Sequence, residues 1–176
     1  MTEMRRVISI YGTIFTPGKL TTDFNHIKNS NCEQKLFIYN ENFHQYLDKN
    51  DLNRGGGNAF LRPYRQDNEK NLVIKEPKIK SLGIPTAMGP ESMETIQDAI
   101  NNIFNYIDNN INITEIYYSS DNNMNLGLGI FANQPFARTN IQEISSLLLM
   151  MFKKLKEKYD VKLYLLESNT TLEKEL

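Results

Sequence analysis

Two glycine-rich segments are the residues of this sequence best suited to chemistry. The first is Arg54-Gly55-Gly56-Gly57-Asn58-Ala59 and the second is Gly127-Leu128-Gly129-Ile130-Phe131. Each follows an apolar, β-prone run and precedes a pattern typical of a helix. Backbone without Cβ at such a corner lets main-chain N–H groups point at an anion, and the start of a helix adds partial positive charge. Together the two segments predict a site for a phosphate-bearing ligand.

The elements around these segments are expected to alternate between strands and helices. β-Branched and apolar runs predict strands at 7–15, 35–39, 79–84, 113–118 and 161–166. Helical spacing of apolar residues predicts helices at 92–107 and 140–158, with weaker signals at 43–53 and at 59–62, where Pro63 is expected to stop the helix. This order indicates an α/β fold with a largely parallel sheet covered on both faces. The strand at 7–15 is expected at the edge of the sheet.

Polar and glycine residues follow the carboxyl ends of these predicted strands. Asn40 is the first of them, and Gly55, Pro85 and Gly127 follow later strands by a few residues. Ligands in parallel α/β sheets bind outside the carboxyl ends of the strands. We therefore expect these residues to converge at one edge of the sheet.

Length and composition narrow the class of protein. A chain of 176 residues with 40% apolar and 23% charged residues is typical of one soluble globular domain. The net charge is −1, and the basic run 153–158 is interpreted as a solvated helix end, so no nucleic-acid partner is expected. No segment has the ~20 apolar residues that cross a bilayer, and the first residues do not resemble a secretion signal. The single cysteine, Cys32, fits a reducing compartment, which makes the cytoplasm the expected location.

Two common phosphate-binding motifs do not fit the first glycine segment. A P-loop requires Lys and then Ser or Thr after the glycines, whereas Asn58 and Ala59 stand there. The dinucleotide-binding fingerprint requires a different glycine spacing. Two separate loops that approach a diphosphate or ribose from opposite sides remain compatible with the sequence.

The order of these motifs resembles the macrodomain superfamily, and within it is similar to macro-like proteins of phage and large DNA viruses. The resemblance covers about 35–152 and is carried by the asparagines after a strand, the two glycine segments, and Gly83-Ile84-Pro85-Thr86. An abundance of asparagine would also suit an AT-rich viral genome, whose product would work in the host cytoplasm. The resemblance implies a macrodomain-like three-layer α/β/α fold with a mostly parallel central sheet and an extra N-terminal strand. It divides the chain into an N-terminal strand and connecting segment (1–34), a core (35–167) and a flexible tail (168–176).

The resemblance also implies a ligand, namely ADP-ribose or a related nucleotide. The residues expected to bind it are Asn40, Asn42, Gly55, Gly56, Gly57, Asn58, Gly127, Leu128, Gly129, Ile130 and Phe131. Arg62 and Arg65 follow the first segment and either reach a ligand phosphate or coat a helix end. No cofactor and no metal site are expected.

The catalytic residues of the superfamily's hydrolases are less well matched in this sequence than its ligand-binding segments. Many ADP-ribosyl hydrolases of the superfamily carry an Asp shortly after the glycines, where this chain has Asn58, Ala59 and Phe60. An amide cannot act as a general base, so binding without turnover is favoured, in order to sense or sequester the nucleotide. Two alternatives stay open. One is an ADP-ribosyl or phosphoester hydrolase that uses Asn42, Asp51 or Asp121, and the other is a protein-interaction module whose interface is the apolar segment 147–152.

Overall fold

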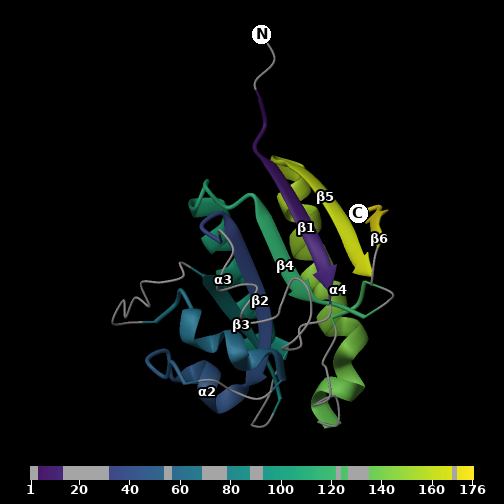
Figure 1. Cartoon of the computed structure of the whole chain (residues 1–176). Helices are drawn as coiled ribbons and strands as arrows, with labels where there is room; N and C mark the ends of the chain where they lie inside the picture. Colours follow the sequence, from purple (N-terminus) through teal and green to yellow (C-terminus); the bar gives the residue numbers. More distant parts are fainter. Residues whose placement is uncertain are drawn as a thin grey trace.

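The computed structural model describes residues 4–13, 32–53, 57–68, 79–87, 93–121, 124–126, 135–167 and 170–176. Within them one six-stranded sheet has the order β3-β2-β4-β1-β5-β6. The strands are β1 (Val7–Thr13), β2 (Lys35–Asn42), β3 (Lys80–Ala87), β4 (Glu115–Ser119), β5 (Asp160–Glu167) and β6 (Thr170–Lys174). β1 to β5 pair in parallel, and β6 pairs antiparallel with β5 (Figure 1). The predicted α/β class with a mostly parallel sheet is confirmed.

The N-terminal strand β1 lies in the interior of the sheet, between β4 and β5. The prediction of an edge strand is therefore wrong. Its buried residues Ile8 and Ile10 alternate with more exposed ones, and both belong to the main core. Alternation reports which face of a strand is covered and not how many neighbouring strands it has, so the sequence pattern could not place β1.

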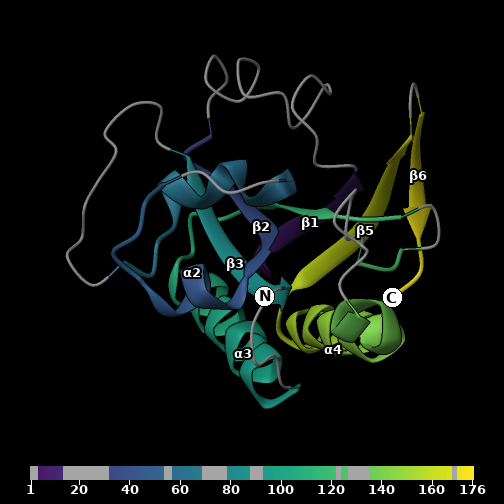
Figure 2. The same cartoon turned by 90° about the horizontal axis from the view of Figure 1, so that it is seen from below.

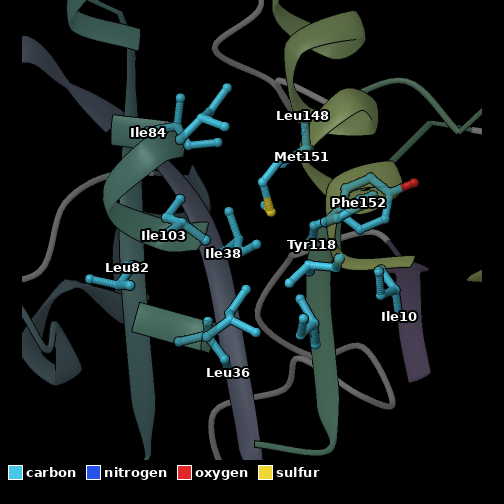
Figure 3. Close-up of a cluster of buried hydrophobic side chains, with 14 of the residues drawn as sticks. Ile10, Leu36, Ile38, Leu82, Ile84, Ile103, Tyr118, Leu148, Met151 and Phe152 are labelled. Atoms are coloured by element: carbon cyan, nitrogen blue, oxygen red, sulfur yellow. The ribbon is translucent and has the colours of Figure 1, made fainter. Parts of the chain in front are cut away.

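Two long helices cover one face of the sheet (Figure 2). They are α3 (Met93–Asn109) and α4 (Pro135–Lys158), and they confirm the two predicted amphipathic helices. Figure 3 shows Ile103 of α3 and Met151 of α4 directed toward Ile38 of β2, and Phe152 of α4 beside Tyr118 of β4. The apolar segment 147–152 therefore contributes to the core through Leu148, Met151 and Phe152, whereas Met150 is exposed.

The other face carries the short 3-10 helix η1 (Gly57–Tyr64). Ala59, Phe60 and Leu61 of η1 pack with Phe37 of β2 and Tyr117 of β4 in a second buried cluster. The helix continues through Pro63, where the sequence predicted that it would stop. A proline lacks a donor, but its fixed φ near −65° suits a 3-10 helix, so the ring does not end η1. The short helix α2 (Phe43–Leu47) joins β2 to this region and agrees with the weak signal at 43–53.

The C-terminal residues include a strand rather than a flexible tail. β6 lies at the edge of the sheet, with Leu165 of β5 paired to Leu172. Its residues are mostly exposed, and Leu172 is the one apolar side chain in the strand, which left no alternating pattern for the sequence to reveal. No helix in the described part of the chain is both long enough and apolar enough to cross a membrane.

All five parallel strands point to the same end of the molecule, and α4 begins at that end (Figure 1). The opposite ends of the helices are tied to the start of β1. Arg6 donates hydrogen bonds to the carbonyls of Ile107 and Asn110 at the end of α3, at 2.8 Å each. The helices α3 and α4 therefore start at the carboxyl end of the sheet, where the sequence predicted a ligand.

Candidate functional site

Buried polar side chains gather where the parallel strands end. Buried polar residues at the strand ends are Thr13 at the end of β1, Asn40 near the end of β2, Thr86 near the end of β3, Ser119 at the end of β4 and Ser120 directly after it; all are at most 9% exposed. β1 and β4 are joined there, since the Ser120 N–H donates to the Thr13 carbonyl at 2.9 Å. The four strands are neighbours in the sheet, so these polar groups share one edge. We call this edge the carboxyl rim.

The two asparagines predicted as ligand residues have different roles in the structure. Asn40 is 8% exposed and continues the alternation of the core residues Leu36 and Ile38, so it lies on the face of α3 and α4 at the carboxyl rim. Asn42 instead caps α2, because its Oδ1 accepts a hydrogen bond from the Gln45 N–H at 2.8 Å. The structure thus brings Asn40 to the predicted location and uses Asn42 for a helix start.

Most of the two glycine segments lies outside the described residues. This holds for Gly55, Gly56 and the whole of Gly127 to Phe131, whereas the backbone of Gly57 and Asn58 begins η1. The residues that flank the segments are described. Before the first segment, Asn53 accepts a hydrogen bond from Arg62, whose partner Glu41 is at the end of β2. Before the second, Leu126 pairs with Ser120 at the end of β4, and its N–H donates to Ser145 of α4.

These flanks connect the two segments to neighbouring strands. β2 and β4 are hydrogen-bonded to each other along Lys35 to Ile38. The described residue before the first glycine segment, Asn53, is therefore linked to the end of β2, and the one before the second, Leu126, to the end of β4. This attachment is compatible with the predicted convergence at the carboxyl rim.

A buried ion pair that the sequence did not predict lies at the end of β2. The Nε of Arg62 donates to Oε2 of Glu41 at 2.7 Å, and both side chains are 0% exposed. The Tyr39 hydroxyl lies 3.4 Å from Oε1 of the same carboxylate. Burial raises the pKa of Glu41, and the hydrogen bond from Arg62 partly opposes that increase. Glu41 and Arg62 are twenty-one residues apart in the sequence, and no periodic pattern connects them. The sequence therefore offers one signal for this pair, which is the position of Glu41 directly after Asn40.

Arg65 forms a second buried network that closes α2. Its Nε and Nη2 bind the carboxylate of Asp67 at 2.8 and 3.3 Å. Its Nη1 donates to the carbonyls of Gln45 and Asp48, and its Nη2 also donates to the carbonyl of Tyr46. Burial alone would lower the pKa of Arg65, but the hydrogen bond with Asp67 and the nearby negative charges together outweigh it and raise that pKa. Arg62 and Arg65 are therefore both buried, and neither coats an exposed helix end.

The ion pair at the end of β2 leaves no space on the adjacent strand. A Cβ on Gly83 of β3 would lie 2.2 Å from Oε1 of Glu41 and 3.0 Å from Cζ of Tyr39. Glycine in the interior of a strand often marks such a close approach. Gly83 is thus required by the buried carboxylate.

The side chains considered for hydrolysis are engaged in local structure. Asp51 accepts a hydrogen bond from the Asn53 N–H at 2.9 Å, and Asp121 accepts two from Asn125, at 3.0 and 3.2 Å. Asn42 is the cap of α2. No group of three or more His, Cys, Asp or Glu side chains suited to a metal ion occurs in the part of the chain that the structure describes.

Comparison with protein-family models, with curated proteins and with solved structures finds no match for this chain. The carboxyl rim and the buried charges beside it are the features of the described chain that bear on its function.

Proposed function

We propose that this chain binds ADP-ribose or a related nucleotide at the carboxyl rim, with a macrodomain-like use of the two glycine segments. The observation that carries the proposal is the set of buried polar side chains at the ends of four adjacent parallel strands. Hydroxyl and amide side chains at such an edge can bind the hydroxyl and phosphate oxygens of a ligand. An open parallel sheet places its ligand at this edge.

The starts of α3 and α4 support an anionic ligand. Both helices begin at the carboxyl rim, where the helix dipole contributes partial positive charge. Glycine backbone in 55–57 and 127–129 would add main-chain N–H donors to phosphate oxygens. A nucleotide with a diphosphate offers both the charge and the hydroxyls that this edge can bind.

The arrangement of the acidic residues Glu41, Asp51 and Asp121 favours binding without turnover. Glu41 is fully buried against Arg62, and Asp51 and Asp121 accept hydrogen bonds from their own turns. A carboxylate fully buried in an ion pair is poorly placed to take a proton from the water that would attack a ligand. The chain would therefore sense or sequester its nucleotide in the cytoplasm, with a viral origin as the proposed context, and would need neither a nucleic-acid nor a membrane partner.

A thermal-shift titration tests the proposal with ADP-ribose, NAD, AMP and poly-ADP-ribose. A ligand at 100 times its Kd stabilises the folded state by about 2.7 kcal/mol, which raises the melting temperature measurably. Gly129→Glu should remove the shift, because it places a negative charge in the second glycine segment. Asn40→Asp should weaken binding at the rim, whereas the same change at the exposed Asn105 of α3 should leave the affinity unchanged.

Two outcomes would contradict the proposal. One is the absence of a shift with every nucleotide at millimolar concentration. The other is steady release of ADP-ribose from a modified protein by the wild-type chain, which would favour the hydrolase instead.

A further inference from the structure

We propose that Arg62 is the buried cation that binds a phosphate oxygen of the ligand, through its Nη2. This inference rests on the proposed function and names the residue that recognises the phosphate. The side chain of Arg62 is 0% exposed, its Nε binds Glu41 at 2.7 Å, and its Nη1 binds the Asn53 carbonyl at 3.0 Å. Its Nη2 is buried and has no hydrogen-bond partner among the residues that the structure describes. A guanidinium carries two N–H donors on that nitrogen, and buried donors in native proteins are nearly always paired.

Arg65 shows that this part of the fold can satisfy a buried arginine completely. It is as buried as Arg62 and lies just beyond η1, yet all three of its nitrogens have partners. The open donors of Arg62 are therefore specific to its position. That position lies between the end of β2, through Glu41, and the flank of the first glycine segment, through Asn53.

The open donors of Arg62 suit a phosphate oxygen. Its Nε is paired with Glu41, whereas Asp67 is bound by the cations of the neighbouring network, Lys49 and Arg65. Neither carboxylate accepts from Nη2 of Arg62. A buried donor is costly until it is hydrogen-bonded, and a phosphate oxygen accepts the strong, charge-assisted hydrogen bonds that an arginine donates.

Glu41 competes with the ligand for the same guanidinium. The carboxylate already occupies Nε, and a phosphate at Nη2 would bring a second anion to the cation that neutralises Glu41. Like charges that share one partner repel each other. Removal of the Glu41 charge should therefore strengthen phosphate binding, whereas a change at Arg62 should weaken it.

The test measures Kd by thermal shift for the full chain and for Arg62→Lys, Arg65→Lys and Glu41→Gln. The probes are ADP-ribose, inorganic pyrophosphate and adenosine, which lacks a phosphate. We expect Arg62→Lys to raise the Kd for the two phosphate-bearing probes roughly tenfold or more, since lysine cannot reproduce the fork of donors. Arg65→Lys is the matched control: it should lower the melting temperature of the free protein and leave the Kd unchanged. Glu41→Gln should lower the Kd about threefold, because the amide still accepts from Nε but carries no charge.

The arms of this experiment separate the inference from the proposed function. A wild-type Kd for ADP-ribose in Arg62→Lys overturns the role of Arg62 and leaves nucleotide binding intact. Arg62-dependent binding of pyrophosphate without binding of any nucleotide contradicts the proposed function and supports the role of Arg62. If Arg62→Lys does not fold, Glu41→Gln decides: equal or weaker phosphate binding than wild type overturns the inference, and tighter binding supports it.

Discussion

Gly83→Ala tests whether the buried ion pair fixes the packing of β2 against β3. The added Cβ would lie 2.2 Å from Oε1 and 2.9 Å from Cδ of Glu41, far inside van der Waals contact. The carboxylate would have to move, yet its Oε2 is held at 2.7 Å by Arg62 in a fully buried pair. Overpacking a core typically costs about 1–3 kcal/mol, and breaking one side of a buried ion pair costs about 3–5 kcal/mol. Since alanine also restricts the unfolded chain by up to about 1 kcal/mol, we expect a net loss of at least about 3 kcal/mol in the free energy of unfolding.

Urea unfolding followed by circular dichroism measures this loss, and Gly12→Ala is the matched control. The Cβ of that variant would also be crowded, at 2.8 Å from the Cδ2 of Leu165 and from the Cβ of Ser120, but no charge pair would be broken. We therefore expect Gly12→Ala to cost less than Gly83→Ala. In a Glu41→Ala background the cost of Gly83→Ala should fall below about 1 kcal/mol, because residues in contact are not additive. A cost below about 1 kcal/mol in the wild-type background, or the same cost with and without Glu41, would refute the reasoning.

Three smaller changes test other parts of the structure by the free energy of unfolding. Asn42→Ala should cost about 1 kcal/mol, because it removes the cap of α2; no loss would show that Asn42 does not support the helix. Asp67→Asn should make the free energy of unfolding depend less on pH in the acid range than it does in wild type. Burial raises the pKa of Asp67, but Arg65 and Lys49 together outweigh this and lower it. The wild-type protein therefore loses the stability that the ionised Asp67 contributes as pH falls below about 4. Urea unfolding from neutral to acid pH measures this loss, and the same decline in free energy of unfolding for wild type and variant would show that the pairing is unimportant. Tyr118→Phe should make the free energy of unfolding less sensitive to alkaline pH. Burial raises the pKa of Tyr118 to about 12, so up to about 2.7 kcal/mol of wild-type stability is lost as pH rises from about 10 through 12, and a parallel decline in the variant would contradict this.

Local patterns predicted the elements but not their neighbours. Helical spacing of isoleucines predicts α3, and the four isoleucines are at most 1% exposed: Ile96, Ile100, Ile103 and Ile107. The apolar run that became β2 was equally clear. Such patterns record which face of an element is covered, which is a local property. The interior position of β1 depends on hydrogen bonds to β4 and β5, which are distant in sequence.

The candidate site was predictable where it follows from the register of a strand. Asn40 continues the alternation of Leu36 and Ile38, so a polar residue at the carboxyl end of β2 was foreseen from the sequence. The pair of Glu41 with Arg62 was not, because it forms between the end of a strand and a 3-10 helix with no repeating pattern. Asn42 was assigned to the ligand although the structure uses it as a cap, since asparagine suits both roles and only the geometry at Gln45 distinguishes them.

Several exceptions to ordinary folding rules lie close together in the part of the chain that the structure describes. Glu41 is a buried carboxylate, Arg62 keeps a buried nitrogen without a partner in the described chain, and Gly83 is a glycine in the interior of a strand. Pro85 lies in β3, which only an edge strand tolerates, and its register partner is Glu41. A sequence selected for stability alone would replace these residues with apolar ones, because exchanging a buried ion pair for packed hydrophobic side chains is often neutral or stabilising. Departures from local rules are expected where function requires them, and their position at the ends of β2 and β3 supports the proposal that a ligand binds at this end of the sheet.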